Sequence, residues 1–240
     1  MRFSYSHYIQ HRFPDRRTGI LELDGIRSDA RTVTTVSDLT KRALKRLETE
    51  TEGAFREIQA WRRAYSAMGL RPTQYRCASE ALLRRLRKDG KLPKLHPLID
   101  LCNAASAAYA FPVAVFDLDK VAGDLMVRQA RGDEIYLSFS GDSETPDPNE
   151  IIFADEEGSA HARRWANRQS LASAVASETT RALIVTEALH EDCRADVRKL
   201  TEELAEMIAD SFAIAPRTEL LLSPESDYVS IPANGCAHVG

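Results

Sequence analysis

The chain has 240 residues, of which 43% are hydrophobic and 28% charged, and its formal net charge is −4. These values are typical of a globular protein and exclude a chain that is disordered over most of its length. The sequence contains no run of about 18 uncharged apolar residues, and the N-terminus lacks the apolar core of a secretory signal. We therefore expect a cytoplasmic protein with no membrane partner, folded over 1–240 as a single domain.

The charge is distributed unevenly along the chain. Between Lys41 and His96 there are 15 Lys and Arg against 6 Asp and Glu, whereas between Pro97 and Ala160 there are 3 against 13. This division is typical of a basic face for a polyanion beside an acidic pocket region. Two solvated helical faces and an acidic loop would produce the same pattern.

Metal and cofactor motifs are absent from the sequence. The cysteines (Cys77, Cys102, Cys193 and Cys236) form no CxxC pair and the histidines no HExxH pair, so we expect reduced thiols, no metal and no cofactor. Neither a GxxxxGK[ST] nor a GxGxxG loop occurs, which argues against the common nucleotide hydrolases and dinucleotide enzymes.

The first half of the chain predicts one strand followed by helices. Residues 20–26 alternate in part and end near a glycine, as a strand does. Ser37 is a suitable N-cap for a helix with leucines on one face. A second helix is expected at 54–67, where its aromatic row is typical of a core, and a third ends at Gly90.

The third helix carries a cluster of cations near its end. Four of them lie within five residues and two more follow shortly after; the set is Arg84, Arg85, Arg87, Lys88, Lys91 and Lys94. Such a cluster can contact RNA phosphates. It can equally be a solvated face that favours the C-terminal end of the helix dipole.

The stretch 92–119 predicts a helix that passes into a strand. Apolar residues recur at helical spacing, and Asp100 and Asn103 lie among them. Pro112 stops the helix, and a strand follows at 113–116. A polar pair on an apolar helix is a plausible pocket wall, although Asp and Asn near a helix start more often cap it.

The second half alternates strands and turns. Strands at 125–130 and 135–139 are expected to form a hairpin with its turn near Gly132. Another strand is expected at 151–153 and an amphipathic helix at 192–212. The apolar segment 182–188 fits either a strand or a helix.

No serine nucleophile motif of the GxSxG type occurs, so any chemistry must come from polar residues beside apolar strands. These residues are Asn103, Asp117, Asp119, Arg128, Glu134, Glu150, Arg168, Gln169, Ser170, Thr179 and Thr180. Such groups can orient a water and an ester without covalent catalysis, because one donor to a developing oxyanion is worth about 3 kcal/mol.

Four sequence segments together resemble the B3/B4 domain family. In chain order they read YRCASEALLRRL, LPKLHPLIDLCNAASAAYAFPVAVFDLDKVAGDLMVRQARGDE, NEIIFADEEGSAHARRWANRQS and ETTRAL. The resemblance covers about 13–212 and leaves 213–240 as a C-terminal extension. This family contains the editing module of the bacterial phenylalanyl-tRNA synthetase beta chain and also free-standing proteins of about this length.

The resemblance implies an α+β fold with a mixed β-sheet flanked by helices. It also implies a pocket where the synthetase module hydrolyses tyrosine mischarged on tRNA, without a metal or a protein nucleophile. On this basis we expect catalytic roles for Asn103, Ser170 and Thr180. We expect substrate contacts from Arg76, Asp100, Ala114, Arg128, Glu150, Arg168, Gln169 and Glu178. Ala114 stands where the synthetase module has a pocket histidine, and Glu178 lies near the region expected for the glutamate that recognises tyrosine.

Three functions follow from these patterns. The first is a free-standing hydrolase that acts in trans on a mischarged aminoacyl-tRNA, with the tRNA acceptor end and an aminoacyl group, and not DNA, as partners. The second is a non-catalytic module that binds tRNA or an amino acid, which the replacement at Ala114 favours. The third is an enzyme acting on a small amino-acid-like molecule.

Overall fold

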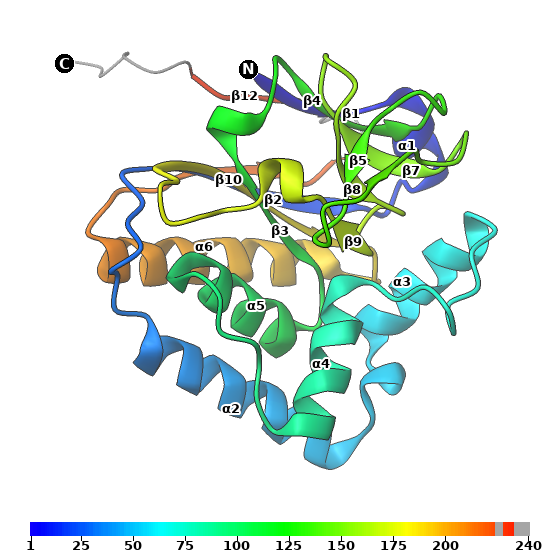
Figure 1. The fold of residues 1–240 in the computed structure, drawn as a ribbon. Helices are drawn as coiled ribbons and strands as arrows, with labels where there is room; N and C mark the ends of the chain where they lie inside the picture. Colours follow the sequence, from blue (N-terminus) through cyan, green and yellow to red (C-terminus); the bar gives the residue numbers. More distant parts are fainter. Residues whose placement is uncertain (224–227, 233–240) are drawn as a thin grey trace.

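The structure, a computed structural model, describes residues 1–223 and 228–232. Residues 224–227 and 233–240 of the expected C-terminal extension, including Cys236, lie outside the described residues. Two β-sheets and a layer of helices are stacked on one another (Figure 1). Mixed sheets with flanking helices confirm the predicted α+β class.

The strands of the described residues form two main sheets. The outer sheet has the order β12-β1-β4-β7-β8-β9 and is mixed, because β1 and β4 are parallel and its other pairs are antiparallel. Its strands are β12 (Tyr228–Ser230), β1 (Arg2–Tyr5), β4 (Leu125–Gln129), β7 (Ile151–Ala154), β8 (Ala160–Arg163) and β9 (Arg168–Gln169). The central sheet is antiparallel, with the order β11-β2-β10-β3. Its strands are β11 (Arg217–Leu221), β2 (Arg17–Asp24), β10 (Arg181–Ala188) and β3 (Val113–Asp117).

Helices α5 and α6 cover the face of the central sheet that points away from the outer sheet, α2 and α4 pack on α5 farther from the sheet, and α1 and α3 lie at the side (Figure 1). They are α1 (His7–Arg12), α2 (Val33–Thr49), α3 (Arg56–Ala67), α4 (Ala78–Asp89), α5 (Pro97–Tyr109) and α6 (Cys193–Phe212). Short 3-10 turns are η1 (Glu52–Ala54), η2 (Leu118–Lys120) and η3 (Leu171–Ser173). Within the described residues, no helix combines the length and apolarity that a membrane crossing needs.

The central sheet is buried on both faces. Along β10, Leu183 and Val185 pack with the outer sheet, whereas Ala182 and Ile184 pack with α5 and α6. A strand buried on both faces is apolar at consecutive positions, so its sequence lacks the alternation that separates a strand from a helix. The ambiguity at 182–188 is thus resolved as a strand. By the same alternation, Glu187 faces the space between the sheets.

The predicted hairpin at Gly132 is wrong. Strand β4 lies between β1 and β7, whereas β5 (Tyr136–Leu137) pairs with β6 (Ser143–Glu144). The turn is closed instead by Glu134, whose carboxylate accepts hydrogen bonds from the backbone N–H groups of Arg131 and Gly132. A carboxylate that satisfies these donors allows the chain to leave the sheet.

Two other local expectations differ from the structure. Ser37 is not an N-cap, because α2 begins at Val33, and the Val36 N–H already donates to the Thr32 carbonyl. The first turn of α2 consists of β-branched residues, which have low helix propensity, so propensity does not predict that the helix starts there. The predicted helix end at Gly90 is confirmed, with φ of 68° at that glycine.

We expect Gly19→Ala to destabilise the fold. Gly19 lies where β2 passes under α6, and a Cβ there would lie 1.9 Å from Thr201 Oγ1 and 2.8 Å from Thr186 Cγ2. Overpacking of this kind costs about 1–3 kcal/mol of the free energy of unfolding, measured by urea titration. Thr201→Ala removes the nearest atom, so the double mutant should lose less than the sum of the single mutants. Additive losses would contradict this contact.

Candidate functional site

A cavity of about 50 Å³ lies where the start of β3, the end of β10 and the segment 162–169 meet. Its walls are largely apolar. The lining residues are Ala78, Pro112, Val113, Ala114, Phe153, Ala162, Trp165, Ala166, Asn167, Arg168, Gln169 and Glu187. An apolar lining with a few polar groups is the usual composition of a ligand site, although this cavity is smaller than most.

Glu187 supplies a buried carboxylate to this cavity and is only 2% exposed. Its Oε1 accepts hydrogen bonds from Tyr5 Oη at 2.7 Å and from Trp165 Nε1 at 2.9 Å. Burial raises the pKa of Glu187 above the ordinary value of a glutamate. A buried carboxyl group with a raised pKa, beside a cavity, is a recognised signature of a functional site.

The polar network behind Glu187 is itself buried. Tyr5 Oη lies 3.0 Å from Thr18 Oγ1, to which Arg16 Nη1 donates at 2.7 Å. The Arg16 guanidinium lies 3.4 Å from the centre of the Tyr5 ring. Burial, followed by the charge of Glu187, raises the pKa of Tyr5 well above its ordinary value. Tyr5 is therefore a neutral donor to the carboxylate.

Trp165 forms one wall of the cavity from a strained turn. Both Arg164 and Trp165 have left-handed backbones, with φ of 47° and 58°, which are unfavourable for residues other than glycine. The turn is held by hydrogen bonds from Arg164 N to Glu150 Oε1 at 3.0 Å and from Trp165 N to the Ile151 carbonyl at 2.6 Å. Strain that the surroundings maintain in this way is frequent at ligand sites.

The rest of the segment is fixed by its neighbours. Asn167 Nδ2 donates to the Arg76 carbonyl at 2.7 Å, and the Gln169 amide donates to the Val115 carbonyl. Arg168 is 43% exposed by side chain, with Nη2 3.2 Å from Glu144. Arg168 thus lines the cavity as a residue, while its guanidinium is held by Glu144 and is partly open to solvent.

The predicted substrate residues fall into two groups. Those that line the cavity are Ala114, Arg168 and Gln169. The others do not line it; they are Arg76, Asp100, Arg128, Glu150 and Glu178. Two of these nevertheless support its wall, Glu150 through its side chain and Arg76 through its carbonyl.

The charged side chains of that second group, other than Glu150, interact with protein groups away from the cavity. Arg128 is ion-paired with Glu134, and Arg76 Nε lies 3.4 Å from Glu80. Asp100 Oδ1 accepts the Leu95 N–H at 2.8 Å, as a residue near a helix start commonly does. Glu178 is exposed and bonded to the neighbouring Ser177 hydroxyl. Their roles toward a substrate stay predictions.

The predicted catalytic residues also lie outside the cavity lining. Asn103 is half-buried on α5, and Thr180 is exposed before β10. Ser170 is fully buried, and its hydroxyl accepts from the Leu137 and Ala172 N–H groups and donates to the Leu137 carbonyl. These bonds fix the chain beside Gln169, so Ser170 acts on the cavity through the backbone.

Glu187 and the aromatic walls of the cavity are not among the residues predicted from the sequence. A charged residue inside the apolar run of β10 was the available signal for Glu187, because an unpaired charge is costly in a core. Phe153 has the pattern of any core residue, so the sequence gives no signal for it.

The basic cluster on α4 divides into paired and unpaired cations. Arg84 and Arg87 lie 3.2 and 3.0 Å from the buried carboxylate of Glu52. Arg85 has Asp89 at 3.8 Å. In contrast, Lys88, Lys91 and Lys94 are exposed and have no ion-pair partner among the described residues. These three lysines are the cations most available to a phosphate.

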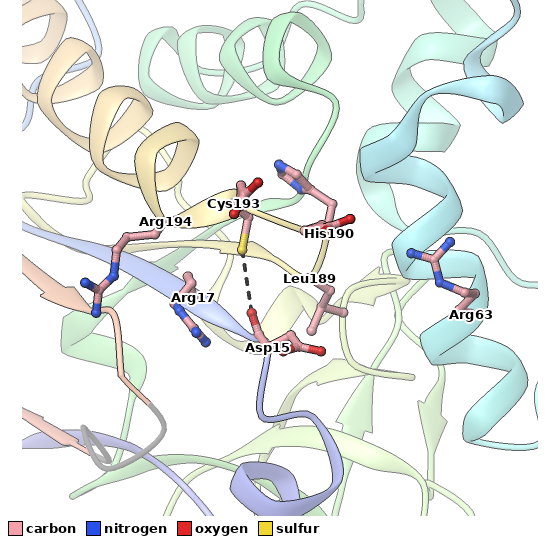
Figure 2. A pocket seen from close by; sticks show the side chains of 9 residues that line it. Asp15, Arg17, Arg63, Leu189, His190, Cys193 and Arg194 are labelled. Atoms are coloured by element: carbon pink, nitrogen blue, oxygen red, sulfur yellow. Dashed lines mark hydrogen bonds between the residues drawn. The ribbon is translucent and has the colours of Figure 1, made fainter.

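A second pocket, of about 600 Å³, opens beside the start of α6 (Figure 2). Two of its arginines already have protein partners: Arg17 donates to two carbonyl oxygens and Arg194 to a third, that of Leu222. Burial raises the pKa of the Cys193 thiol to about 11, so it is unreactive. Within the described residues no group of three or more His, Cys, Asp and Glu is placed to hold a metal ion. The cavity at Glu187 is therefore the better candidate.

Comparison with known proteins identifies the family. The model of the B3/4 domain matches residues 60–206, more than half of the chain, so the chain belongs to the B3/4 domain family. The matched range includes every residue of the cavity lining.

The similar curated proteins are subunits of an aminoacyl-tRNA synthetase. The phenylalanine–tRNA ligase beta subunit of Nitrobacter winogradskyi is 39% identical over 79 residues, which cover 33% of this chain and 10% of that protein. That of Methylococcus capsulatus is 37% identical over 73 residues, or 30% and 9%. An N-terminal fragment of the phenylalanyl-tRNA synthetase beta subunit from Pyrococcus horikoshii matches 90% of this chain and 50% of its own, with 10% identity and a TM-score of 0.48. The aligned part is thus about a tenth of the curated relatives' length.

We expect Glu187→Gln to alter how stability depends on pH. Because the pKa of folded Glu187 is raised, wild type should lose free energy of unfolding as the pH rises from about 4.3 to that pKa, and then level off. Glutamine keeps an acceptor for Tyr5 and Trp165 without a charge.

Urea titrations between pH 4.5 and 8 should therefore show the stability difference between Glu187→Gln and wild type shifting in favour of the variant as the pH increases. Glu206→Gln, at an exposed position on α6, serves as the control and should follow wild type. Equal pH slopes for all three proteins would show that Glu187 does not titrate abnormally.

Proposed function

We propose that the chain hydrolyses mischarged aminoacyl-tRNA in trans, with the side chain of the amino acid in the cavity at Glu187. The observation that carries this proposal is a buried carboxylate on the wall of an otherwise apolar cavity, inside the segment that matches the B3/4 domain. The related synthetase subunits support an aminoacyl-tRNA as the substrate class. In this proposal the protein acts in the cytoplasm, where charged tRNAs are found.

The cavity lining includes a residue suited to ester hydrolysis. Attack of water on the ester carbonyl places negative charge on the carbonyl oxygen, and a positioned donor stabilises that charge. In this proposal the donor is Arg168, a lining residue whose side chain is partly open to solvent. Its hydrogen bonds to Glu144 orient the guanidinium before substrate binds. In this proposal the ribose of the terminal nucleotide and the cavity position the ester.

Helix α4 connects the cavity to the exposed lysines. Its first residue, Ala78, lines the cavity, and Lys88 lies near its other end. At 1.5 Å per residue the helix spans about 17 Å between these ends. A tRNA acceptor strand whose last nucleotide reaches the cavity would therefore pass along α4 toward Lys88, Lys91 and Lys94.

Binding without catalysis is the second candidate function. It is favoured by Ala114, which lines the cavity and has no titratable group where the family resemblance implies a histidine. A pocket that keeps its shape but not its proton-transfer groups would still bind an amino acid or a charged tRNA end. The third candidate is an enzyme that acts on a small amino-acid-like molecule without RNA.

A panel of mischarged tRNAs tests the hydrolase. Wild type should deacylate at least one faster than buffer, and Arg168→Ala should lower kcat by about 10²-fold, the usual loss for one oxyanion donor. Arg198→Ala, an exposed arginine on α6 paired only with Glu202, is the matched control. Deacylation no faster than buffer for every tRNA would leave the binding functions and an enzyme that acts without RNA.

The lysines at the end of α4 are tested by the salt dependence of tRNA binding. Replacing Lys88, Lys91 and Lys94 by alanine should weaken binding and reduce the slope of log K against log salt by about 2, since each single-strand phosphate contact contributes about 0.7. Lys199→Ala on α6 should leave the slope unchanged. Binding that does not vary with salt in wild type would favour a small-molecule substrate.

A further inference from the structure

We infer that Trp165 restricts the site to aminoacyl groups with small side chains, of the size of alanine or serine, and excludes aromatic ones. This inference rests on the proposed function, because it names the substrate class of the same cavity. It differs from the tyrosine substrate that the family resemblance implies. Trp165 would thus be a specificity-determining residue.

The first step of the argument is the volume of the cavity. It measures about 50 Å³, whereas an apolar cavity that admits benzene is about 150 Å³. A phenol or phenyl ring therefore has no room beside Glu187 while Trp165 keeps its position. A methyl or hydroxymethyl group, comparable in size to one or two water molecules, fits.

The second step is that Trp165 does not readily move. Its side chain is fully buried, and its ring lies edge-on to Trp61 and Phe13, with centroid distances of 5.1 and 4.9 Å. Its Nε1 donates to Glu187, and its backbone N–H donates to Ile151. Rotation of the indole would leave a buried donor unpaired, a cost of about 1–3 kcal/mol, besides breaking these ring contacts.

The third step is that the aromatic wall facing the core and most of the smaller walls are fixed. Phe153 is 1% exposed in the core between the sheets, and its ring lies 5.1 Å from that of Phe116. Four of the ten remaining lining residues are alanines, whose methyl groups have no rotamer to change, and the side chains of Asn167 and Gln169 are held by hydrogen bonds to backbone carbonyls. Packed interiors of this kind resist the entry of even a few additional atoms. The size limit therefore depends on Trp165.

The alanines of the cavity allow a test that does not require catalysis. Ala78, Ala114, Ala162 and Ala166 all line the cavity, so ¹³C-methyl NMR of alanine-labelled protein reports what enters it. The probes are serinamide and tyrosinamide, which mimic the aminoacyl group without being hydrolysed rapidly. In wild type, serinamide should shift these methyl signals. Tyrosinamide should bind at least about tenfold more weakly, which is the lower end of the discrimination that a size mismatch gives.

Enlarging the cavity should reverse this order. Trp165→Phe retains a ring in the core but shortens it and removes the donor to Glu187; Trp165→Ala opens the cavity further. Both should raise the affinity for tyrosinamide relative to serinamide, more so for Trp165→Ala. Trp61→Phe is the matched control, because Trp61 packs on Trp165 without lining the cavity, and it should keep the wild-type order.

The outcomes separate this inference from the proposed function. If no tRNA is deacylated but the amides follow the expected order, hydrolysis fails and the size limit stands. If deacylation occurs but tyrosinamide binds wild type as well as serinamide does, the size limit fails and hydrolysis stands. Failure of both amides to shift any of the four methyl signals, in wild type and in Trp165→Phe, would overturn the inference.

Discussion

The hydrogen bonds to the buried carboxylate of Glu187 hold the site together. Tyr5 from the first strand and Trp165 from the turn after β8 donate to the same oxygen, Oε1 of Glu187, near the end of β10. A carboxylate in a core is tolerated only with such partners, since an uncompensated buried charge costs several kcal/mol. The interaction therefore joins the outer sheet to the central sheet at the cavity. Without it, the Trp165 Nε1–H group would be buried with no acceptor.

The same principle explains the division of charge along the chain. Half of the ten arginines of the basic segment pair with glutamates buried in the same segment: Glu52 is contacted by Arg84 and Arg87, Glu80 by Arg62 and Arg76, and Glu57 by Arg46. The guanidinium group suits this task because it can make several directed hydrogen bonds at once. The lysines, which are more strongly hydrated, remain in solvent. The excess of positive charge is thus partly a structural requirement, and the surface available to a polyanion is smaller than the residue count suggests.

Sequence reasoning succeeded where local patterns decide the structure. The apolar spacing of α5 and α6 and the glycine at Gly90 each express one local rule, and each was confirmed. It failed where partners come from distant parts of the chain. The turn at Gly132 looks like a hairpin until β4 is seen between β1 and β7, and β10 is ambiguous because both of its faces are buried. Glu187 was missed for the same reason, since its donors lie 182 and 22 residues away.

Ala114 and Trp165 must be considered as a pair. The family resemblance implies a histidine at Ala114, and its replacement by a methyl group leaves space on the β3 side of the cavity. The indole of Trp165 lines the same cavity from the opposite segment, so the resulting volume is set by both. An alanine in place of a histidine removes a group that could exchange a proton or form a hydrogen bond with a ligand. Selection among ligands at this wall then depends more on their shape. A shape-based site can reject large side chains strongly, because steric exclusion is costly in a packed interior, but it separates alanine from serine only weakly. A site of this kind would suit discrimination by size among aminoacyl groups, with Glu187 fixing the shape.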